Sequence, residues 1–366
     1  MTECQSIFVT KHGVPDVLKL KSDSLKEPII GEVCVKIKYS GINFADIMGR
    51  MGLYPTAPKP PYVPGFEIAG IIEKTGDDKT KNLVGRAVVG LSRFHGYSTH
   101  TNVPVNQLFF INEKWLDVAA AIPVNYLTAY FMMIHQAAIR ENEWFLIHGI
   151  GGGVGIAALQ IAQHLGVKII GTCSGWKHDQ IREMGVEHLI DYRSENFKDR
   201  VLEITDGNGA DVIIDSLGGK ALKDSFGCLA EFGRLISYGF SKAAPGTKKN
   251  ILKILPEYLG MPKFNPMHLM SKNKGVFGFH LGLIQKRQDL VKKYGSLLLK
   301  WLDDGIISPK VDAVFPLEKA AEAQKKAEEA VAEFEKTREK HRAAEKEAEK
   351  AEEATKEAKN KIVAKI

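Results

Sequence analysis

The chain has 366 residues, of which 44% are hydrophobic, and its formal net charge is +6. This length and composition predict a globular protein of two domains with buried cores and exclude a wholly disordered chain. Because 44 acidic residues accompany 50 basic ones, the positive charge does not indicate a nucleic-acid-binding protein.

The four cysteines stand far apart in the sequence, without a C-x-x-C pair or a metal-binding spacing: Cys4, Cys34, Cys173 and Cys228. They are typical of free thiols in a reducing compartment. The first residues, MTECQSIFVTKHG, lack the charged and apolar regions of a secretory signal. We therefore expect a cytoplasmic protein.

Residues 1–125 contain short β-like runs interrupted by many glycines and prolines, including 33–39, 68–72 and 87–91. They predict a small β-rich domain. From residue 126 to about 279, strands and helices alternate, which predicts a doubly wound, six-stranded parallel sheet in an α/β fold. The six strand candidates are 144–148, 168–173, 189–191, 211–215, 234–238 and 275–279.

The most informative segment is WFLIHGIGGGVGIAALQIAQHLG (residues 144–166), an apolar strand followed by a glycine-dense turn and a helix. It lacks a strict G-x-G-x-x-G motif but contains G-x-x-G-x-x-G through Gly149, Gly152 and Gly155. Such a turn lets the backbone approach a dinucleotide pyrophosphate, which the helix N-terminus then stabilises. The alternatives are a flexible turn in an apolar hairpin and a membrane span, although the glycines and polar residues make a poor span.

The next strand should end near the ribose of the cofactor. In NAD-binding proteins an acidic residue stands about 20 residues beyond the glycines and binds the 2′-hydroxyl. Here Ser174 and Lys177 occupy that region, and Tyr192 follows the third strand. A hydroxyl, an ammonium and a phenol suit a 2′-phosphate better, so the sequence favours NADPH over NADH. The alternative is a solvated loop with an ordinary lysine.

The segment from residue 241 to 276 contains seven lysines and one glutamate, interleaved with large apolar residues. Such a basic, apolar insertion is consistent with binding to an anionic lipid surface. The alternatives are a cap over the substrate cleft, a dimer contact and a packed helical excursion. The prolines of the segment prevent one continuous amphipathic helix.

The last part of the chain is composed mainly of Ala, Glu and Lys. A helix is expected to begin within 316–323 and to return to the first domain. Residues 324–358 predict an extended, charged and solvated helix with i, i+4 ion pairs, because it has too few apolar residues for a strong coiled-coil seam. Residues 359–366 are compatible with a short final strand.

Several motifs together resemble the medium-chain dehydrogenase/reductase superfamily: SGINFADIMGRMGLYP (40–55), PYVPGFEIAG (61–70), VNYLTAY (124–130), the glycine turn, IDY (190–192) and DSLGG (215–219). Within it, the chain resembles the zeta-crystallin-like quinone oxidoreductases, and most closely the synaptic-vesicle amine-transport-protein homologues. The resemblance covers about residues 5–323. Departures are the Ala/Glu/Lys helix and the unusual number of glycines in the turn.

The resemblance implies a GroES-like catalytic domain over 1–125, completed by about 280–323, with 359–366 as a further candidate segment. It implies a Rossmann NADP-binding domain over 126–279, followed by the charged helix over 324–358. Zinc-dependent members carry metal ligands about where Asn43, Phe66 and Val124 stand. These residues cannot form a tetrahedral zinc site, so we expect no metal.

The resemblance also implies a set of cofactor contacts. Asn43 and Thr128 would lie near the nicotinamide. The residues that approach the pyrophosphate would be Gly152, Gly153, Val154 and Gly155. Those that bind the 2′-phosphate would be Ser174, Lys177 and Tyr192. Those that wrap the cofactor after the later strands would be Ser216, Leu217, Gly239, Phe240, Phe277 and Phe279.

Tyr54 is the one candidate proton donor near the acceptor, with a role as a plain pocket wall as the alternative. Asp46 is expected to fix a turn through hydrogen bonds. His95, His100 and His135 show no partner spacing and are expected to be surface or packed residues.

Two functional hypotheses follow. The first is a zinc-independent, NADPH-dependent oxidoreductase that reduces a quinone or an enone by hydride transfer. The second is a membrane-associated, reductase-like protein for vesicle function or phospholipid transfer with little turnover, peripheral on vesicle or organelle membranes. Relatives of this kind also suggest a homodimer.

Overall fold

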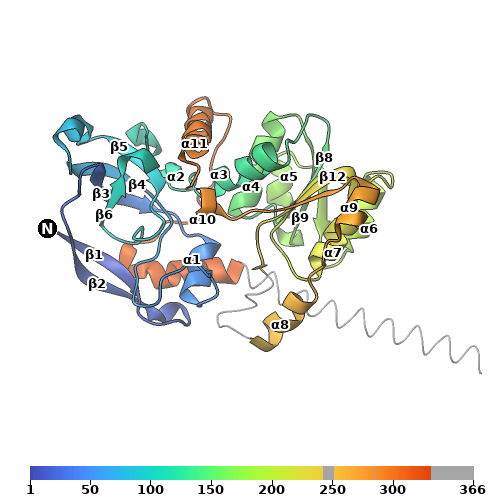
Figure 1. Ribbon diagram of the computed structural model, residues 1–366, viewed down its shortest axis with the longest axis horizontal. Helices are drawn as coiled ribbons and strands as arrows, with labels where there is room; N and C mark the ends of the chain where they lie inside the picture. The colour runs from blue at the N-terminus through green and yellow to red at the C-terminus, as the bar shows by residue number, and fades with distance from the viewer. Residues whose placement is uncertain (242–250, 285, 331–366) are drawn as a thin grey trace, which may run out of the picture.

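Two sheets of different kinds organise the chain. The computed structural model describes residues 1–241, 251–284 and 286–330. A lobe built on antiparallel strands, the first lobe, lies beside a lobe built on parallel strands, the second lobe (Figure 1). The chain therefore has the GroES-like and Rossmann-like architecture that the sequence predicts.

The first lobe contains a hairpin and a five-stranded antiparallel sheet. The hairpin pairs β1 (Thr2–Val9) with β2 (Leu18–Leu25). The strands of the sheet lie in the order β6 (His100–Pro104), β3 (Glu32–Ser40), β4 (Glu67–Thr75), β5 (Ala87–Leu91) and β7 (Leu108–Phe110). Small buried aliphatic side chains, among them Val33, Val35 and Ile68, fill one core of this lobe. The three predicted runs are β3, β4 and β5.

The helices of the first lobe are short. They are α1 (Phe44–Arg50) and α2 (Leu116–Ala119), with 3-10 turns at Pro15–Val17, Asp78–Leu83, Val105–Gln107 and Glu113–Trp115. In α1, the carboxylate of Asp46 accepts a hydrogen bond from the backbone N–H of Asn43, so the side chain of the third helical residue satisfies a donor at the helix start. This bond fixes where α1 begins.

The second lobe is a parallel six-stranded sheet in the order β10 (His188–Asp191), β9 (Lys168–Cys173), β8 (Trp144–His148), β11 (Ala210–Asp215), β12 (Leu229–Ser237) and β13 (Gly275–Gly278). All six predicted strands are present. β12 begins at Leu229, before the predicted start at 234, because Leu229 is buried and pairs with Ala210.

Alternate side chains of the central strands enter different cores. On β8, Phe145 and Ile147 join one core, whereas Leu146 joins the other. A strand buried on both faces reads as a continuous apolar run, which explains why the sequence predicted these strands. The covering helices are α3 (Asn125–Tyr130), continued by a π-turn (Phe131–Gln136), α4 (Gly153–His164), α5 (His178–Glu183), α6 (Phe197–Ile204) and α7 (Ala221–Gly227).

The basic apolar segment before β13 forms two helices, α8 (Ile251–Leu259) and α9 (Pro266–Lys272). Pro256 stands inside α8, and Asn265 caps α9 by accepting a hydrogen bond from the N–H of Met267. Residues 242–250, which carry three of the lysines, lie outside the described residues. The described part of the segment therefore contains two short helices instead of one continuous amphipathic helix.

After β13 the chain returns to the first lobe. It passes through α10 (Leu281–Ile284), α11 (Gln288–Asp303) and a 3-10 turn (Leu317–Lys319) into a helix that continues to residue 330. Ala320 packs with Ile7, Val9 and Tyr62 of the first lobe. The predicted return of the chain is confirmed, whereas most of the predicted 324–358 helix and the 359–366 strand lie outside the described residues.

The end of the described chain is held by a buried ion pair. Arg50, which is fully buried, bonds to Glu328 and to the side-chain oxygen of Gln324. None of the described helices has both the length and the apolar character needed to cross a bilayer.

Candidate functional site

The glycine turn between β8 and α4 has the form that a pyrophosphate requires. Gly149 has φ +67°, a left-handed conformation that favours glycine. A Cβ at Gly155 would meet the carbonyl oxygen of Gly149, so the close approach of turn and helix requires a glycine there. With Gly152 at its N-cap, α4 presents its first N–H groups and its positive dipole end at the turn.

The three residues predicted to bind a 2′-phosphate lie together. The hydroxyl oxygens of Ser174 and Tyr192 are 2.8 Å apart, and the Nζ atom of Lys177 lies 3.4 Å from the carbonyl oxygen of Gly151 in the glycine turn. The nearby carboxylate of Asp191 accepts hydrogen bonds from the N–H groups of Gly175 and Arg193. Backbone donors therefore offset part of the negative charge beside the hydroxyls.

The turns after β11 and β12 also lie against each other. The backbone N–H of Ser241 donates to the carbonyl oxygen of Ser216 at 3.1 Å, and a Cβ at Gly239 would stand 2.7 Å from that oxygen. A Cβ at Gly218 would likewise stand 2.7 Å from the Phe240 ring. The structure thus brings the predicted residues Ser216, Leu217, Gly239 and Phe240 to one place, beside the glycine turn: the Oγ atom of Ser216 donates to the carbonyl oxygen of His148.

Phe277, in β13, and Phe279, directly after β13, lie in different environments. Phe277 is 38% exposed, whereas Phe279 packs on Phe131 and its N–H donates to the carbonyl oxygen of Ser237. Phe279 therefore lies beside the end of β12, close to the predicted cofactor turns. Phe277 is on the exposed edge strand.

Asn43 and Thr128 are linked through Glu67, which the sequence reasoning missed. The buried carboxylate of Glu67 accepts hydrogen bonds from the Nδ2 atom of Asn43 and the backbone N–H of Val124, both at 2.8 Å. Thr128, in α3, donates its own N–H to the carbonyl oxygen of Val124. Burial raises the pKa of Glu67 to about 8, although both hydrogen bonds lower it in part. Its place in the motif GFE was the available signal.

Asp46 fixes the loops around the start of α1, as expected. Besides Asn43, its carboxylate accepts hydrogen bonds from the N–H of Gly65 at 2.9 Å and from the Tyr97 hydroxyl at 3.4 Å. Complete burial raises its pKa to about 7 against these bonds. The expected structural role is confirmed.

A fully buried histidine, also missed from the sequence, underlies the cofactor turns. The Nδ1 atom of His148 lies 3.0 Å from the Thr172 hydroxyl and its Nε2 atom 3.1 Å from the Ser225 hydroxyl. Because Ser225 donates to the Oδ2 atom of Asp215, its oxygen accepts from the Nε2–H group of His148, and Nδ1 then accepts from Thr172.

The far ends of this His148 network reach two turns. The Thr172 hydroxyl also accepts from the N–H of Gly149 at 3.4 Å, and the Oδ1 atom of Asp215 accepts from the N–H groups of Leu217 and Gly218 at 2.8 Å. One imidazole therefore ties β8, β9 and β11 together where their strands end. Such a fully bonded buried network favours a single geometry of the turns.

Tyr54 lies in a row of rings at the boundary of the lobes. It packs edge-on against Phe66 and is stacked on His280, with ring centroids 5.5 Å apart and an interplanar angle of 21°. Phe66 continues the row to Phe94. Of the histidines named from the sequence, His100 pairs with Glu73 and His135 contacts Tyr294, which matches their expected structural roles.

The positions that correspond to zinc ligands do not fit a zinc ion. Phe66 and Val124 have apolar side chains, and the amide of Asn43 is bonded to Glu67. In the described parts of the chain, no group of three or more His, Cys, Asp and Glu side chains is arranged to hold a metal.

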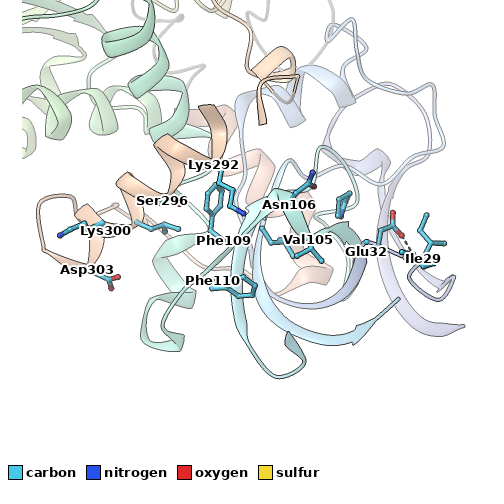
Figure 2. Close-up of a pocket in the computed structure, with 15 residues that line it drawn as sticks. Ile29, Glu32, Val105, Asn106, Phe109, Phe110, Lys292, Ser296, Lys300 and Asp303 are labelled. Atoms are coloured by element: carbon cyan, nitrogen blue, oxygen red, sulfur yellow. Dashed lines mark hydrogen bonds between the residues drawn. The ribbon is translucent and has the colours of Figure 1, made fainter. Parts of the chain in front are cut away.

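A surface groove of about 940 Å³ lies elsewhere, between α11 and the β7 edge of the first lobe (Figure 2). Its walls include Phe109 and Phe110 from β7 and Lys292 and Lys300 from α11. None of the predicted cofactor residues lines it. The groove is therefore separate from the candidate site.

Comparisons with known proteins agree with this geometry. Residues 30–107 match the family model "Alcohol dehydrogenase GroES-like domain", and residues 153–296 match "Zinc-binding dehydrogenase". The chain is 34% identical to a synaptic vesicle membrane protein VAT-1 homolog of Danio rerio, over 89% of this chain and 68% of the relative. It is 31% identical to the human quinone oxidoreductase, over 87% of this chain and 92% of the relative. The solved structure of Escherichia coli quinone oxidoreductase complexed with NADPH matches with a TM-score of 0.76 and 30% identity, covering 89% of this chain and 97% of that one.

Proposed function

Because the chain belongs to the medium-chain dehydrogenase/reductase superfamily of oxidoreductases, we propose that it is an NADPH-dependent reductase of quinone or enone acceptors. The observation that carries this proposal is the glycine turn flanked by the Ser174–Tyr192 hydroxyl pair. That arrangement supplies backbone donors for a diphosphate and polar side chains for a 2′-phosphate.

Different predicted residues would contact different parts of the cofactor. Gly152, Gly153, Val154 and Gly155 would lie along the pyrophosphate, and Ser174, Lys177 and Tyr192 would bind the 2′-phosphate. Ser216, Leu217, Gly239, Phe240, Phe277 and Phe279 would enclose the remainder, and Asn43 and Thr128 would contact the nicotinamide end. When bound, the cofactor supplies a hydride; the protein orients it toward the acceptor and excludes water.

The acceptor class follows from the missing zinc ligands. A metal acting as a Lewis acid would stabilise the alkoxide formed from an alcohol during oxidation, and Phe66 and Val124 cannot bind such a metal. A quinone or an enone is already electron-poor and accepts a hydride without a metal. We place the acceptor beside Tyr54, where the two lobes meet.

The test has two parts. Fluorescence titration should show that NADPH binds, and absorbance at the nicotinamide band should show its consumption with a panel of quinones and enones. Gly155→Val, which places side-chain atoms against the Gly149 carbonyl, should abolish binding, whereas Gly305→Ala at an open surface turn should not. A protein that binds no nicotinamide cofactor would overturn the proposal.

A second function is favoured by a specific surface. On α8 and α9, five large apolar side chains are half or more exposed: Leu255, Tyr258, Leu259, Met267 and Met270. Lys263 and Lys272 stand beside them in the sequence. Exposed apolar and basic groups together are typical of a surface that binds anionic lipid. We propose peripheral membrane binding through this α8–α9 surface, compatible with a vesicle role.

Co-sedimentation with vesicles of phosphatidylcholine and phosphatidylserine tests the second function. Lys263→Glu with Lys272→Glu should reduce binding, and added salt should do the same, because the attraction is screened. Lys292→Glu with Lys300→Glu on α11 is the matched control. Unchanged binding of the α8–α9 variant would contradict this function.

We also propose a homodimer, because β13 is the last strand of the parallel sheet among the described residues and a second chain could extend the sheet there. Sedimentation of the purified protein should give twice the mass of one chain.

A further inference from the structure

A phenol and an imidazole from different lobes meet where the parallel sheet ends. His280 follows β13 at its carboxyl end, and its ring is stacked on Tyr54, which follows α1 in the first lobe. In open parallel sheets, ligands bind outside the carboxyl ends of the strands. The pair therefore stands where an acceptor would approach a cofactor bound to this sheet.

His280 has an unsatisfied polar atom at this place. Its Nδ1 atom is buried and has no hydrogen-bond partner among the described residues, while the residue as a whole is partly exposed. A buried nitrogen without a partner costs about 1–3 kcal/mol, so such an atom calls for a specific explanation. The oxygen of a bound acceptor would satisfy it.

We propose that His280, on which the ring of Tyr54 is stacked, is a catalytic residue that donates a proton to the oxygen of the acceptor. The inference rests on the proposed function. A hydride, with its two electrons, adds to the β-carbon of an enone, and the π electrons shift to the carbonyl oxygen. That oxygen takes the Nδ1 proton of the imidazolium and forms an enol, which becomes the ketone. The neutral imidazole regains its proton from water.

Tyr54 is less suited to release the proton. Burial raises the pKa of its phenol above the ordinary value, with nearby Asp46 acting in the same direction and Arg93 and the Thr56 hydrogen bond acting against it. An imidazole that carries a proton on Nδ1 can pass it to an acceptor oxygen as a general acid. Tyr54 therefore remains a neutral ring that orients the acceptor.

The proposal distinguishes two acceptor classes. The enolate formed from an enone is strongly basic and requires a proton, whereas a reduced quinone is a stable phenolate. Loss of His280 should therefore affect enone reduction more than quinone reduction. This difference separates a proton donor from a residue that merely shapes the pocket, since a pocket defect would affect both classes.

The experiment compares the full-length wild type with His280→Asn, His280→Gln and Tyr54→Phe, using 2-cyclohexenone and 1,4-naphthoquinone. For both His280 variants, kcat with the enone should fall by about 100-fold, the lower end for general acid catalysis, while kcat with the quinone changes by less than about threefold. NADPH affinity should be unchanged. His100→Asn, on β6, is the control.

A second readout does not require turnover. In nitrogen NMR of the wild type loaded with NADP⁺, addition of 2-cyclohexenone should shift the Nδ1 resonance of His280. An unmoved resonance, or wild-type enone turnover in both His280 variants, overturns the assignment of His280 while leaving the reductase proposal intact. A wild type that binds no NADPH overturns the proposed function instead.

Discussion

The hydroxyl oxygen of Ser174, at the end of β9, lies 2.8 Å from that of Tyr192, just beyond β10. The ends of two neighbouring strands thus place two hydroxyl groups side by side. The ammonium group of Lys177 contacts the glycine turn next to this pair. This convergence makes the preference for a phosphorylated ribose testable.

Lys177→Ala and Ser174→Ala should each weaken NADPH binding by about 10- to 100-fold, since hydrogen bonds to charged groups contribute about 1.5–3 kcal/mol. The affinity for NADH should remain the same, because NADH lacks the 2′-phosphate. Fluorescence titration with both cofactors measures the difference. Lys168→Ala, at the other end of β9, provides a control of equal charge change; an equal loss for both cofactors would refute the assignment.

The His148 network should matter for both stability and cofactor affinity. His148→Leu leaves the hydroxyls of Thr172 and Ser225 without the imidazole, which should lower the free energy of unfolding by about 2–4 kcal/mol. NADPH affinity should fall at least tenfold, because the turns after β8 and β11 lose their common support. Urea denaturation and titration measure the two effects.

Two partial replacements refine this prediction. His148→Asn places an amide near Thr172 and His148→Gln places one near Ser225, so each should recover part of the stability. His188→Leu, a partly buried histidine at the start of β10 that contacts Trp144, is the control. Full NADPH affinity in a folded His148→Leu protein would show that the network does not support the turns.

Glu67→Gln should change the pH dependence of stability. Burial raises the folded-state pKa of Glu67 to about 8 from its ordinary value of 4.5, so the folded protein holds this proton more tightly than the unfolded chain. Its contribution to stability is complete below about pH 4.5 and is lost as the pH rises through about 8. The glutamine variant cannot ionise and should be more stable than the wild type at pH 9, by about 1–3 kcal/mol, but not at pH 5.

Denaturation curves at both pH values test this sign. Glu73→Gln, on the partly exposed outer side of β4, should show no such trend relative to the wild type. A glutamine variant whose stability falls as steeply as that of the wild type between pH 5 and pH 9 would contradict the burial of an ionisable carboxyl at this position.

The ion pair between Arg50 and Glu328 should hold the last described helix. Glu328→Ala leaves a fully buried guanidinium without its carboxylate and should cost about 3–5 kcal/mol of unfolding free energy. Replacing both residues with methionine should restore most of this loss, since no buried charge remains. Glu322→Ala, in an exposed pair with Lys319, should change stability by less than about 1 kcal/mol.

The sequence predicted the parallel sheet better than the antiparallel one. Strands such as β8 are buried on both faces and read as apolar runs, whereas β2 (LKLKSDSL) is mostly exposed and gives no such signal. The cofactor turns were predictable because each directly follows a strand. The boundaries placed at residues 125 and 279 stay predictions.

Glu67, His148 and His280 were missed for a common reason. Their partners are distant in the chain: Glu67 bonds to Asn43 across 24 positions and His148 to Ser225 across 77. No local pattern of residue types encodes such contacts, because they depend on how strands are ordered in the sheets. Only Glu67, within a recognisable motif, carried a local hint.

The described chain crosses between the lobes twice, once between α2 and α3 and once after β13. At the first crossing the carboxylate of Glu67 accepts a hydrogen bond from the backbone N–H of Val124, and at the second the ring of His280 is stacked on that of Tyr54. Because the two rings belong to different lobes, the shape of the space beside them depends on how the lobes are set relative to each other.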